Sequence, residues 1–419
     1  MATITQTPVV PVSRKLGTLE KFFSLVDRHR PVHFAVAAHI LGRTTISACR
    51  TALDALQERH PLFSVGIEQP IGGLPRFRST TVPIAIRIVD PRLSTWQAEM
   101  ARELANPFRT RQAPLMRAVL LHRTNESTLI LTAHHSIANG LSLSYAMRDV
   151  LQALRGETLQ PLPSLPAQEP LMYMLQEESA GDGDSAQSEP IQESQPVAFR
   201  PLNGSLPSIE ALSLSSQLTD RLVEISRREG TTVHGALCSA LVLAGQEISS
   251  AWDRFPVRIL SPFSLRKQLG VGEDCGLFVW AGIVPMDPPA SADFWDLARY
   301  AKSSLTAKQS PQRVAREMKG LEQALEAGVD VDTASQILAQ GLPCELLLTN
   351  HGSLPIQADD GGLKLKSLWG PAVLMGFEGE QTVGVTTTSG ALSLLHTSFA
   401  PLPSLLQGAE RILRSACDR

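Results

Sequence analysis

A long stretch without lysine or arginine, residues 156–199, interrupts this chain of 419 residues. Its early part contains four prolines: Pro161, Pro163, Pro166 and Pro170. Its later part is dominated by glutamate, aspartate, serine, glutamine and glycine. A segment of this composition cannot bury enough apolar surface to order itself. We therefore predict a partly flexible linker over residues 161–205, which separates an N-terminal half, residues 1–160, from a C-terminal half, residues 206–419.

The overall composition is that of a globular protein. Hydrophobic residues make up 43% and charged residues 19% of the chain, so each half has the material for an ordinary core. The formal net charge is −3, no basic stripe is present, and aromatic residues account for only 5%. Nucleic-acid binders show a basic excess and often a stacking surface. We expect no nucleic-acid partner.

Neither a membrane span nor a metal site is predicted. The best candidate runs without charge, residues 231–246 and 275–286, are shorter than the ~20 apolar residues that a bilayer crossing requires. The first twelve residues have neither the basic start nor the apolar core of a secretory signal. Five scattered cysteines without CxxC spacing predict neither a disulfide framework nor a zinc site. We expect a cytoplasmic protein without an integral membrane segment or a metal.

Both halves show alternating helix and strand patterns. Apolar residues at helical spacing predict helices over residues 46–59, 143–154, 218–228 and 232–244, and a mostly helical segment over 289–340. Short apolar runs predict strands over residues 61–67, 118–122, 129–132, 257–260, 278–284, 346–349 and 383–388. The two runs around residues 124–127 predict a hairpin. These patterns favour an α/β or α+β fold.

Residues 129–142 carry the most distinctive chemistry. A strand runs into His134 and His135, a short loop comes next, and a helix begins near Gly140. Adjacent side chains on a strand point to opposite sides, which argues against zinc binding by this pair. By spacing alone, a hydrogen-bonded structural pair is the commoner interpretation, and a backbone amide of the loop facing a ligand is the functional one.

The segment His134-His135-Ser136-Ile137-Ala138-Asn139-Gly140 resembles the His-His-x-x-x-Asp-Gly motif of the condensation-domain and chloramphenicol-acetyltransferase-like acyltransferases, with Asn139 in place of the aspartate. Further segments resemble landmarks of that superfamily in the same order: residues 106–117, 260–266, 275–279 and 348–352. The chain is most similar to the stand-alone, polyketide-associated (phthiocerol dimycocerosyl transferase-like) acyltransferases. The resemblance implies an α/β fold of two chloramphenicol-acetyltransferase-like halves, each a mixed sheet with helices. The active site would lie at their interface.

The resemblance assigns the general base to His135. Acyl transfer to an alcohol or amine requires removal of a proton, and a largely neutral imidazole can accept it at pH 7. His134 is expected to pack against the fold and orient the loop. The backbone N–H of Gly140 is a candidate donor to the oxyanion. Arg266 is expected to hold the loop through Asn139, which accepts a hydrogen bond but lacks the charge of aspartate.

Two assignments have structural alternatives. Ser136 could line the substrate tunnel, although a small loop residue is the favoured interpretation. Trp369 could shape the acyl pocket, and a buried core aromatic is at least as good an explanation. A thioester is already activated, so no enzyme nucleophile is required, and no cysteine stands beside a base in the sequence.

The predicted function is acyl transfer in secondary-metabolite or lipid biosynthesis. The donor would be an acyl carrier protein or coenzyme A thioester acting as co-substrate, with no bound cofactor. The acceptor would be a small alcohol or amine, with ester formation favoured over amide formation, and we expect a monomer. Two alternatives stay open: a catalytically silent relative that binds a carrier protein or ligand, and a repurposed pocket that acts on a tethered intermediate.

Overall fold

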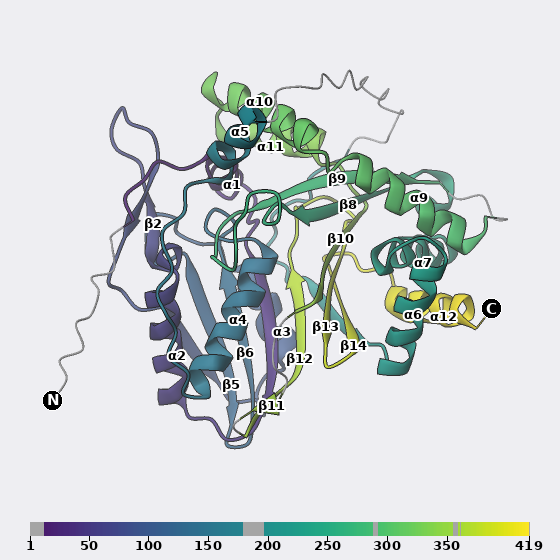
Figure 1. Ribbon diagram of the computed structural model, residues 1–419, viewed down its shortest axis with the longest axis horizontal. Helices are drawn as coiled ribbons and strands as arrows, with labels where there is room; N and C mark the ends of the chain where they lie inside the picture. Colours follow the sequence, from purple (N-terminus) through teal and green to yellow (C-terminus); the bar gives the residue numbers. More distant parts are fainter. Residues whose placement is uncertain (1–11, 179–196, 288–291, 355–358, 361, 419) are drawn as a thin grey trace.

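The structure, a computed structural model, describes residues 12–178, 197–287, 292–354, 359–360 and 362–418. Two six-stranded mixed sheets lie side by side, each with its own helices (Figure 1). The α/β architecture predicted from the sequence is confirmed. No helix in the described ranges has the length and apolar character needed to cross a membrane.

The first sheet is built mainly from the N-terminal half. Its strands follow the order β11 (Asp359–Asp360), β12 (Leu363–Ala372), β1 (Phe34–Leu41), β6 (Glu126–Ala133), β5 (Met116–Arg123) and β4 (Ala85–Val89). β5 and β6 form the predicted hairpin, and β4 is parallel to β5. Helices α2 (Ile46–Arg59) and α4 (Gly140–Leu154) contact each other on one side, and α3 (Trp96–Ala105) contacts β1 and β6.

The second sheet belongs entirely to the C-terminal half. Its strands follow the order β7 (Ser208–Ser213), β14 (Ala391–Ser398), β13 (Gln381–Thr388), β10 (Leu346–Ser353), β8 (Val257–Ser264) and β9 (Val279–Met286). β10 is parallel to both of its neighbours, and the remaining pairs are antiparallel. The helices that pack with this sheet are α6 (Ser216–Arg228), α7 (Val233–Ile248), α8 (Ser250–Arg254), α9 (Phe294–Ala307) and α12 (Leu405–Cys417). Leu237, Leu241 and their neighbours on α7 fill the core beneath this sheet.

A third group of helices gathers at one end of the molecule, near β8 and β9 (Figure 1). It consists of α1 (Thr18–Val26), α5 (Gln168–Glu178), α10 (Pro311–Glu326) and α11 (Val331–Gly341). The short elements η1 (Pro61–Ser64), β2 (Val65–Glu68) and β3 (Arg76–Ser79) connect α2 to the rest of the N-terminal half.

The C-terminal half contributes a strand to the first sheet. β12 pairs antiparallel with β1 over most of its length, from Ala35 opposite Ala372 to Leu41 opposite Lys364. The Thr386 hydroxyl on β13 also donates to the carbonyl of Leu368 on β12, which ties the donated strand to the second sheet. Backbone hydrogen bonds therefore link the halves directly.

The predicted linker is not irregular throughout. Residues 168–178 form α5, and Met172 is buried against Leu265, Val314 and Met318. Apolar residues between the prolines and the acidic run supply this helix with a packing face, which the overall composition of the stretch concealed. The acidic segment expected to be flexible lies outside the described residues from residue 179 to residue 196. The division of the chain at residues 161–205 stays a prediction.

Candidate active site

The His-His segment forms the turn between a buried strand and a helix. β6 ends at Ala133, and α4 begins at Gly140. The N–H of His134 donates to the carbonyl of Leu115, and the N–H of Ile137 donates to the carbonyl of His134. These bonds fix the backbone between strand and helix, and the two imidazoles then diverge into different surroundings.

His134 points into the N-terminal half and is fully buried. Its Nε2 lies 3.2 Å from Asp27 Oδ2, and its Nδ1 accepts a hydrogen bond from the N–H of Ser136. Burial alone would raise the pKa of Asp27, but the imidazoles of His134 and His33 hold it well below its usual range. Asp27 is therefore an ionised carboxylate that orients His134, the first residue of the loop.

His135 points the other way, into a cavity between the two halves. Its ring stacks on Phe23 with centroids 4.5 Å apart and leans on Phe34 at the same distance. Burial lowers the pKa of His135 to about 3, because the imidazolium would lose its hydration there. The ring is therefore neutral at physiological pH. Its Nδ1 is buried, which leaves Nε2 for a molecule in the cavity.

The cavity has a volume of about 1030 Å³ and takes its walls from both halves. Apolar side chains dominate the lining: Leu19, Phe22, Phe23, Phe34, Leu260, Pro262, Phe263, Val279, Ile283 and Val373 are among them. Three histidines also line it: His135, His234 and His351. An apolar chamber with a few convergent polar groups is the usual form of a small-molecule site.

Asn139 caps the helix that comes after the loop. Its Oδ1 accepts from the N–H and the hydroxyl of Ser142, at 2.9 and 2.8 Å. Its Nδ2 donates to the carbonyl of Phe278 in the C-terminal half, at 3.1 Å. Both ends of the amide are thus used, and the donor end requires asparagine because a carboxylate has no N–H to give.

Arg266 reaches the loop through Ser142. Its Nη2 donates to Ser142 Oγ at 2.7 Å, and its Nη1 donates to the carbonyls of Gly272 and Asp274. Within the described parts of the chain, Arg266 makes no hydrogen bond to Asn139. The expected direct pair is therefore wrong, because the Ser142 hydroxyl bonds to both side chains.

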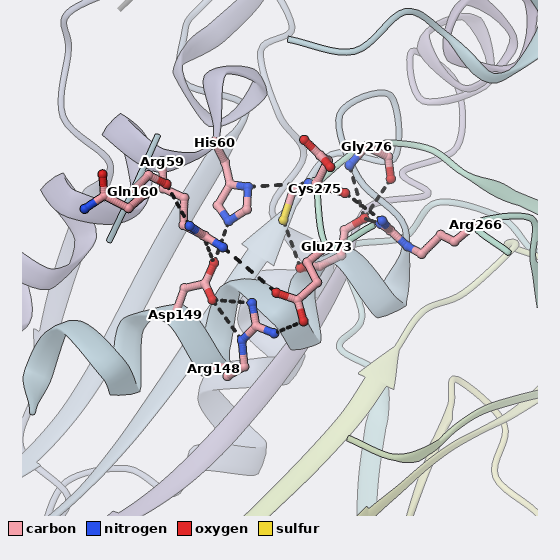
Figure 2. Close-up of polar contacts among 11 residues, drawn as sticks. Arg59, His60, Arg148, Asp149, Gln160, Arg266, Glu273, Cys275 and Gly276 are labelled. Atoms are coloured by element: carbon pink, nitrogen blue, oxygen red, sulfur yellow. Dashed lines mark hydrogen bonds and ion pairs between the residues drawn. The ribbon is translucent and has the colours of Figure 1, made fainter. Parts of the chain in front are cut away.

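An ionic cluster centred on the buried side chain of Asp149 lies beside the same region (Figure 2). Asp149 on α4 binds the side chains of Arg59, His60 and Arg148. Arg148 continues to Glu273 at 2.5 Å, and His60 Nδ1 accepts from the backbone N–H of Cys275. The next residue then bonds to the loop, since the carbonyl of Gly276 accepts from the N–H of Asn139 and lies 2.7 Å from Ser142 Oγ. The cluster therefore joins α2, α4 and residues 273–276 across the two halves.

His60, Asp149 and Cys275 resemble a nucleophilic triad only in composition. The Cys275 thiol is buried and directed at the carbonyl of Ser142, 3.2 Å away. Burial raises the pKa of this thiol, which keeps it protonated. Cys275 is also absent from the cavity lining. The arrangement is structural.

Ser136 and Trp369 do not line the cavity. The Ser136 hydroxyl donates to the carbonyl of Glu20 and is fully buried. Trp369 stacks on Trp96, 5.7 Å between centroids, in a small core between the first sheet and α3. Ser136 is thus a small buried loop residue and Trp369 a buried core aromatic. The assignment of both residues to the substrate tunnel is wrong.

Two of the cavity histidines were not predicted as site residues. His234 lies in the first turn of α7 and contacts the Ser261 hydroxyl through Nε2. His351 lies on β10, within the Thr-Asn-His-Gly segment at residues 349–352. The resemblance of that segment to a landmark of the superfamily was a usable signal for its position. No local pattern pointed to His234.

No group of three or more metal-binding side chains occurs among the residues that the structure describes. The histidines of the cavity contact hydroxyls and aromatic rings. The donor set around the cavity does not favour a metal.

Comparison with known families gives a consistent result. Residues 203–374 match the family described as "Phthiocerol/phthiodiolone dimycocerosyl transferase C-terminus". Phosphinothricin tripeptide synthetase PhsC of Streptomyces viridochromogenes is 29% identical over 236 residues, which cover 50% of this chain and 22% of that protein. Tyrocidine synthase 3 of Brevibacillus parabrevis is 22% identical over 319 residues, 73% of this chain and 5% of that protein. The chain thus spans less than a quarter of the length of these curated relatives.

Solved structures share the fold along nearly the whole chain. Polyketide synthase associated protein 5 from Mycobacterium tuberculosis has a TM-score of 0.65 at 18% identity, covering 97% of this chain and 98% of that one. The first condensation domain of the calcium-dependent antibiotic synthetase has a TM-score of 0.68 at 14% identity, covering 97% and 96%. The chain thus shares the fold of these condensation-domain and polyketide-associated proteins, and its residues 203–374 are similar to the dimycocerosyl transferase family. The solved neighbours include condensation domains, and in this chain the cavity lies between the two halves.

Proposed function

We propose that this protein transfers an acyl group from a thioester to a hydroxyl or amine in the central cavity. The observation that carries the proposal is the position of His135. Its neutral imidazole lies at the wall of an apolar chamber of about 1030 Å³, on the loop that ends at Asn139, the N-cap of α4. Base, apolar chamber and helix N-terminus lie together.

In the proposed step, the acceptor oxygen or nitrogen attacks the thioester carbonyl carbon. A new C–O or C–N bond forms, the C–S bond breaks, and the electron pair of that bond leaves with sulfur. The acceptor's proton passes to His135 Nε2 and then to the departing thiolate, which leaves as a free thiol. A positioned base of this kind contributes ~10²–10⁴-fold to the rate.

The low pKa of His135 shapes how that proton moves. Burial disfavours the imidazolium, so His135 holds the proton only briefly. The nearby carboxylate of Asp27 pairs with His134 and leaves His135 without an ion-pair partner among the described residues. Transfer from acceptor to leaving sulfur is therefore expected to be closely coupled to bond formation, and a stored imidazolium is not required.

The first turn of α4 supplies a donor for the oxyanion. Gly140 is the first residue of the helix, where backbone N–H groups have no partner within the helix, and it lines the cavity. Donors of this kind act strongly in a dry site because they are already oriented when charge develops. The partial positive charge of the helix N-terminus acts in the same direction.

The donor is proposed to be an acyl carrier protein or coenzyme A thioester, used as a co-substrate with no bound cofactor. The aliphatic and aromatic cavity lining suits an acyl chain. We place a hydroxyl acceptor ahead of an amine because the C-terminal half matches a transferase named for phthiocerol and phthiodiolone. The product would then be an ester of a secondary metabolite or lipid.

The test is incubation of the purified protein with acyl-coenzyme A thioesters of increasing chain length and a panel of alcohols and amines. Free thiol and coupled product are measured together, by a thiol reagent and by mass spectrometry. Transfer that requires protein and acceptor supports the proposal, and the coupled mass distinguishes ester from amide. Tight binding of a thioester or carrier without any transfer would instead favour the catalytically silent alternative.

A further inference from the structure

A second histidine of the cavity wall, His351, lies next to the first turn of α4. His351 comes from β10 of the C-terminal half, and its Nδ1 lies 2.9 Å from Ser144 Oγ on α4 of the N-terminal half. The bond crosses the interface between the halves. It fixes the ring at the cavity wall and leaves Nε2 without a hydrogen bond inside the described part of the chain.

Nε2 of His351 lies against Gly140. A Cβ atom placed on Gly140 would come 2.6 Å from His351 Nε2 and 2.8 Å from its Cε1. No real Cβ tolerates such contacts, so glycine at this position is what allows the imidazole to reach the helix N-terminus. His351 Nε2 consequently lies beside the first residue of α4, and both residues line the cavity.

The hydrogen-bond requirements of Ser144 determine the tautomer of His351. Ser144 is fully buried, and within the described residues its hydroxyl has one polar contact, His351 Nδ1. If Nδ1 carried the proton, the hydroxyl hydrogen would be buried without an acceptor, which costs ~1–3 kcal/mol. The satisfied arrangement has Ser144 donating to Nδ1 and the ring proton on Nε2.

The ring stays neutral, which keeps this arrangement intact. Burial lowers the pKa of His351 to about 4. A neutral ring with one proton on Nε2 is a hydrogen-bond donor directed at the cavity, and it cannot serve there as a base. The role of His351 therefore differs from that of His135, in which Nδ1 is buried and Nε2 is left to accept a proton from a molecule in the cavity.

We propose that His351 is a second oxyanion donor, and that its Nε2–H and the N–H of Gly140 together bind the thioester carbonyl oxygen as it becomes negative. The catalytic role of His351 rests on the proposed function. The tautomer of His351, which is set by Ser144, does not depend on any substrate. His351 would be a catalytic residue supplied by one half to a reaction whose base is supplied by the other.

The tautomer is measured first, by nitrogen-15 NMR of the whole protein labelled at histidine. The His351→Gln variant identifies the His351 signals by their loss. We expect a protonated Nε2 and an unprotonated Nδ1 that accepts a hydrogen bond, and we expect Ser144→Ala to shift the Nδ1 signal. A protonated Nδ1 in the wild-type protein would overturn the proposal, whether or not acyl transfer has been detected.

The donor role is measured by kinetics on the wild-type transfer reaction. His351→Ala is expected to lower kcat by ~10²–10³-fold with little change in KM, the usual effect of removing one oxyanion donor. His351→Gln, which restores an N–H donor but no base, is expected to recover at least tenfold of that loss. His29→Gln, at a half-exposed histidine outside the cavity lining, is the matched control and should retain wild-type kcat.

The outcomes separate three roles. No recovery in His351→Gln, with a kcat as low as that of His351→Ala, would overturn the donor role in favour of proton transfer. A wild-type kcat in His351→Ala, or a loss that follows only a lowered melting temperature, would overturn it in favour of a structural role. Absence of transfer by the wild-type protein under all donors and acceptors would reject the proposed function, and with it the catalytic role, while the NMR result would still stand or fall separately.

Discussion

At the scale of single residues, Asn139 shows why a departure from a motif can have a structural reason. The resemblance implies aspartate at this position, paired with arginine. Here the amide caps α4 through Oδ1 and donates through Nδ2 to the carbonyl of Phe278, which also accepts from the N–H of Leu265. Ser142 takes over the contact with Arg266. The substitution and the rerouted contact are therefore parts of one arrangement.

The Asn139→Asp variant is expected to destabilise the protein by ~1–3 kcal/mol, because one carboxylate oxygen would replace a donor and face the Phe278 carbonyl without a partner. Urea unfolding followed by circular dichroism measures the change. Asn125→Asp, in the exposed turn between β5 and β6, is the matched control and should stay within ~0.5 kcal/mol. Equal stability of Asn139→Asp and wild type would contradict this account.

At the scale of elements, local periodicity predicted the features that local sequence controls. The helix over residues 46–59 has its predicted bounds, because its apolar face and the proline after His60 act within a few residues. The predicted strand over residues 61–67 is wrong in its first part, where Pro61 begins a short 3₁₀ turn. Pairing of β12 with β1 joins residues more than 300 positions apart, and no local pattern specifies it.

In the candidate site, too, the local sequence predicted some residues, while others depend on long-range packing. The local motif placed His135, Asn139 and Gly140 in one loop, and the structure places all three on the cavity wall. Ser142 as the junction with Arg266 could not be predicted, because it depends on how residues 272–278 fold back onto α4. The position of His351 beside α4 could not be predicted either, because it depends on how the two halves pack together.

The junction between α4 and the C-terminal half depends on one hydroxyl. Ser142 Oγ contacts Asn139, Arg266 and the backbone of Gly276. Ser142→Ala is expected to cost ~1–3 kcal/mol of unfolding free energy, since Arg266 and the Gly276 N–H would be left short of an acceptor. Ser47→Ala, at an exposed position in the first turn of α2, is the control. A Ser142→Ala midpoint in urea equal to that of Ser47→Ala would refute the junction.

At the scale of the whole molecule, the halves share both a sheet and a cavity. β12 of the C-terminal half is hydrogen-bonded to β1 of the N-terminal half, and the Asp149 cluster adds a second connection (Figure 2). The chain between the halves is thus not what keeps them together. This property has a direct physical test.

A specific protease site inserted within residues 180–195 is expected to permit cleavage of the chain without separation of the halves. The two fragments should elute together from a size-exclusion column under native conditions and separate only in denaturant. The cavity histidines should keep their NMR signals after the cut. Elution of two separate fragments in native buffer would show that the shared sheet does not hold the molecule together.

Acid is expected to destabilise the molecule through the three cavity histidines. Burial lowers the pKa of His135 to about 3, and of His234 and His351 to about 4, whereas unfolding returns each to ~6.5. The unfolded chain therefore binds more protons between pH ~4 and pH ~6.5, and stability, complete above that window, falls as the pH decreases through it. Each histidine contributes a slope of up to ~1.4 kcal/mol per pH unit, or ~4 kcal/mol for the three together.

Urea unfolding at pH 7 and pH 5 measures this slope. His351→Gln should flatten it by about one histidine's share. Identical midpoints at the two pH values would mean that the cavity histidines are hydrated in the folded protein.

The most direct test of the account is the single-turnover rate of acyl transfer in wild type and in His135→Ala, with the thioester donor and acceptor that wild type uses. Loss of the base should lower the rate by ~10²–10⁴-fold while the melting temperature stays close to that of wild type. His29→Ala, outside the cavity lining, should transfer at the wild-type rate. Transfer by His135→Ala at the wild-type rate would contradict the account, because it would place the chemistry away from the imidazole that faces the cavity.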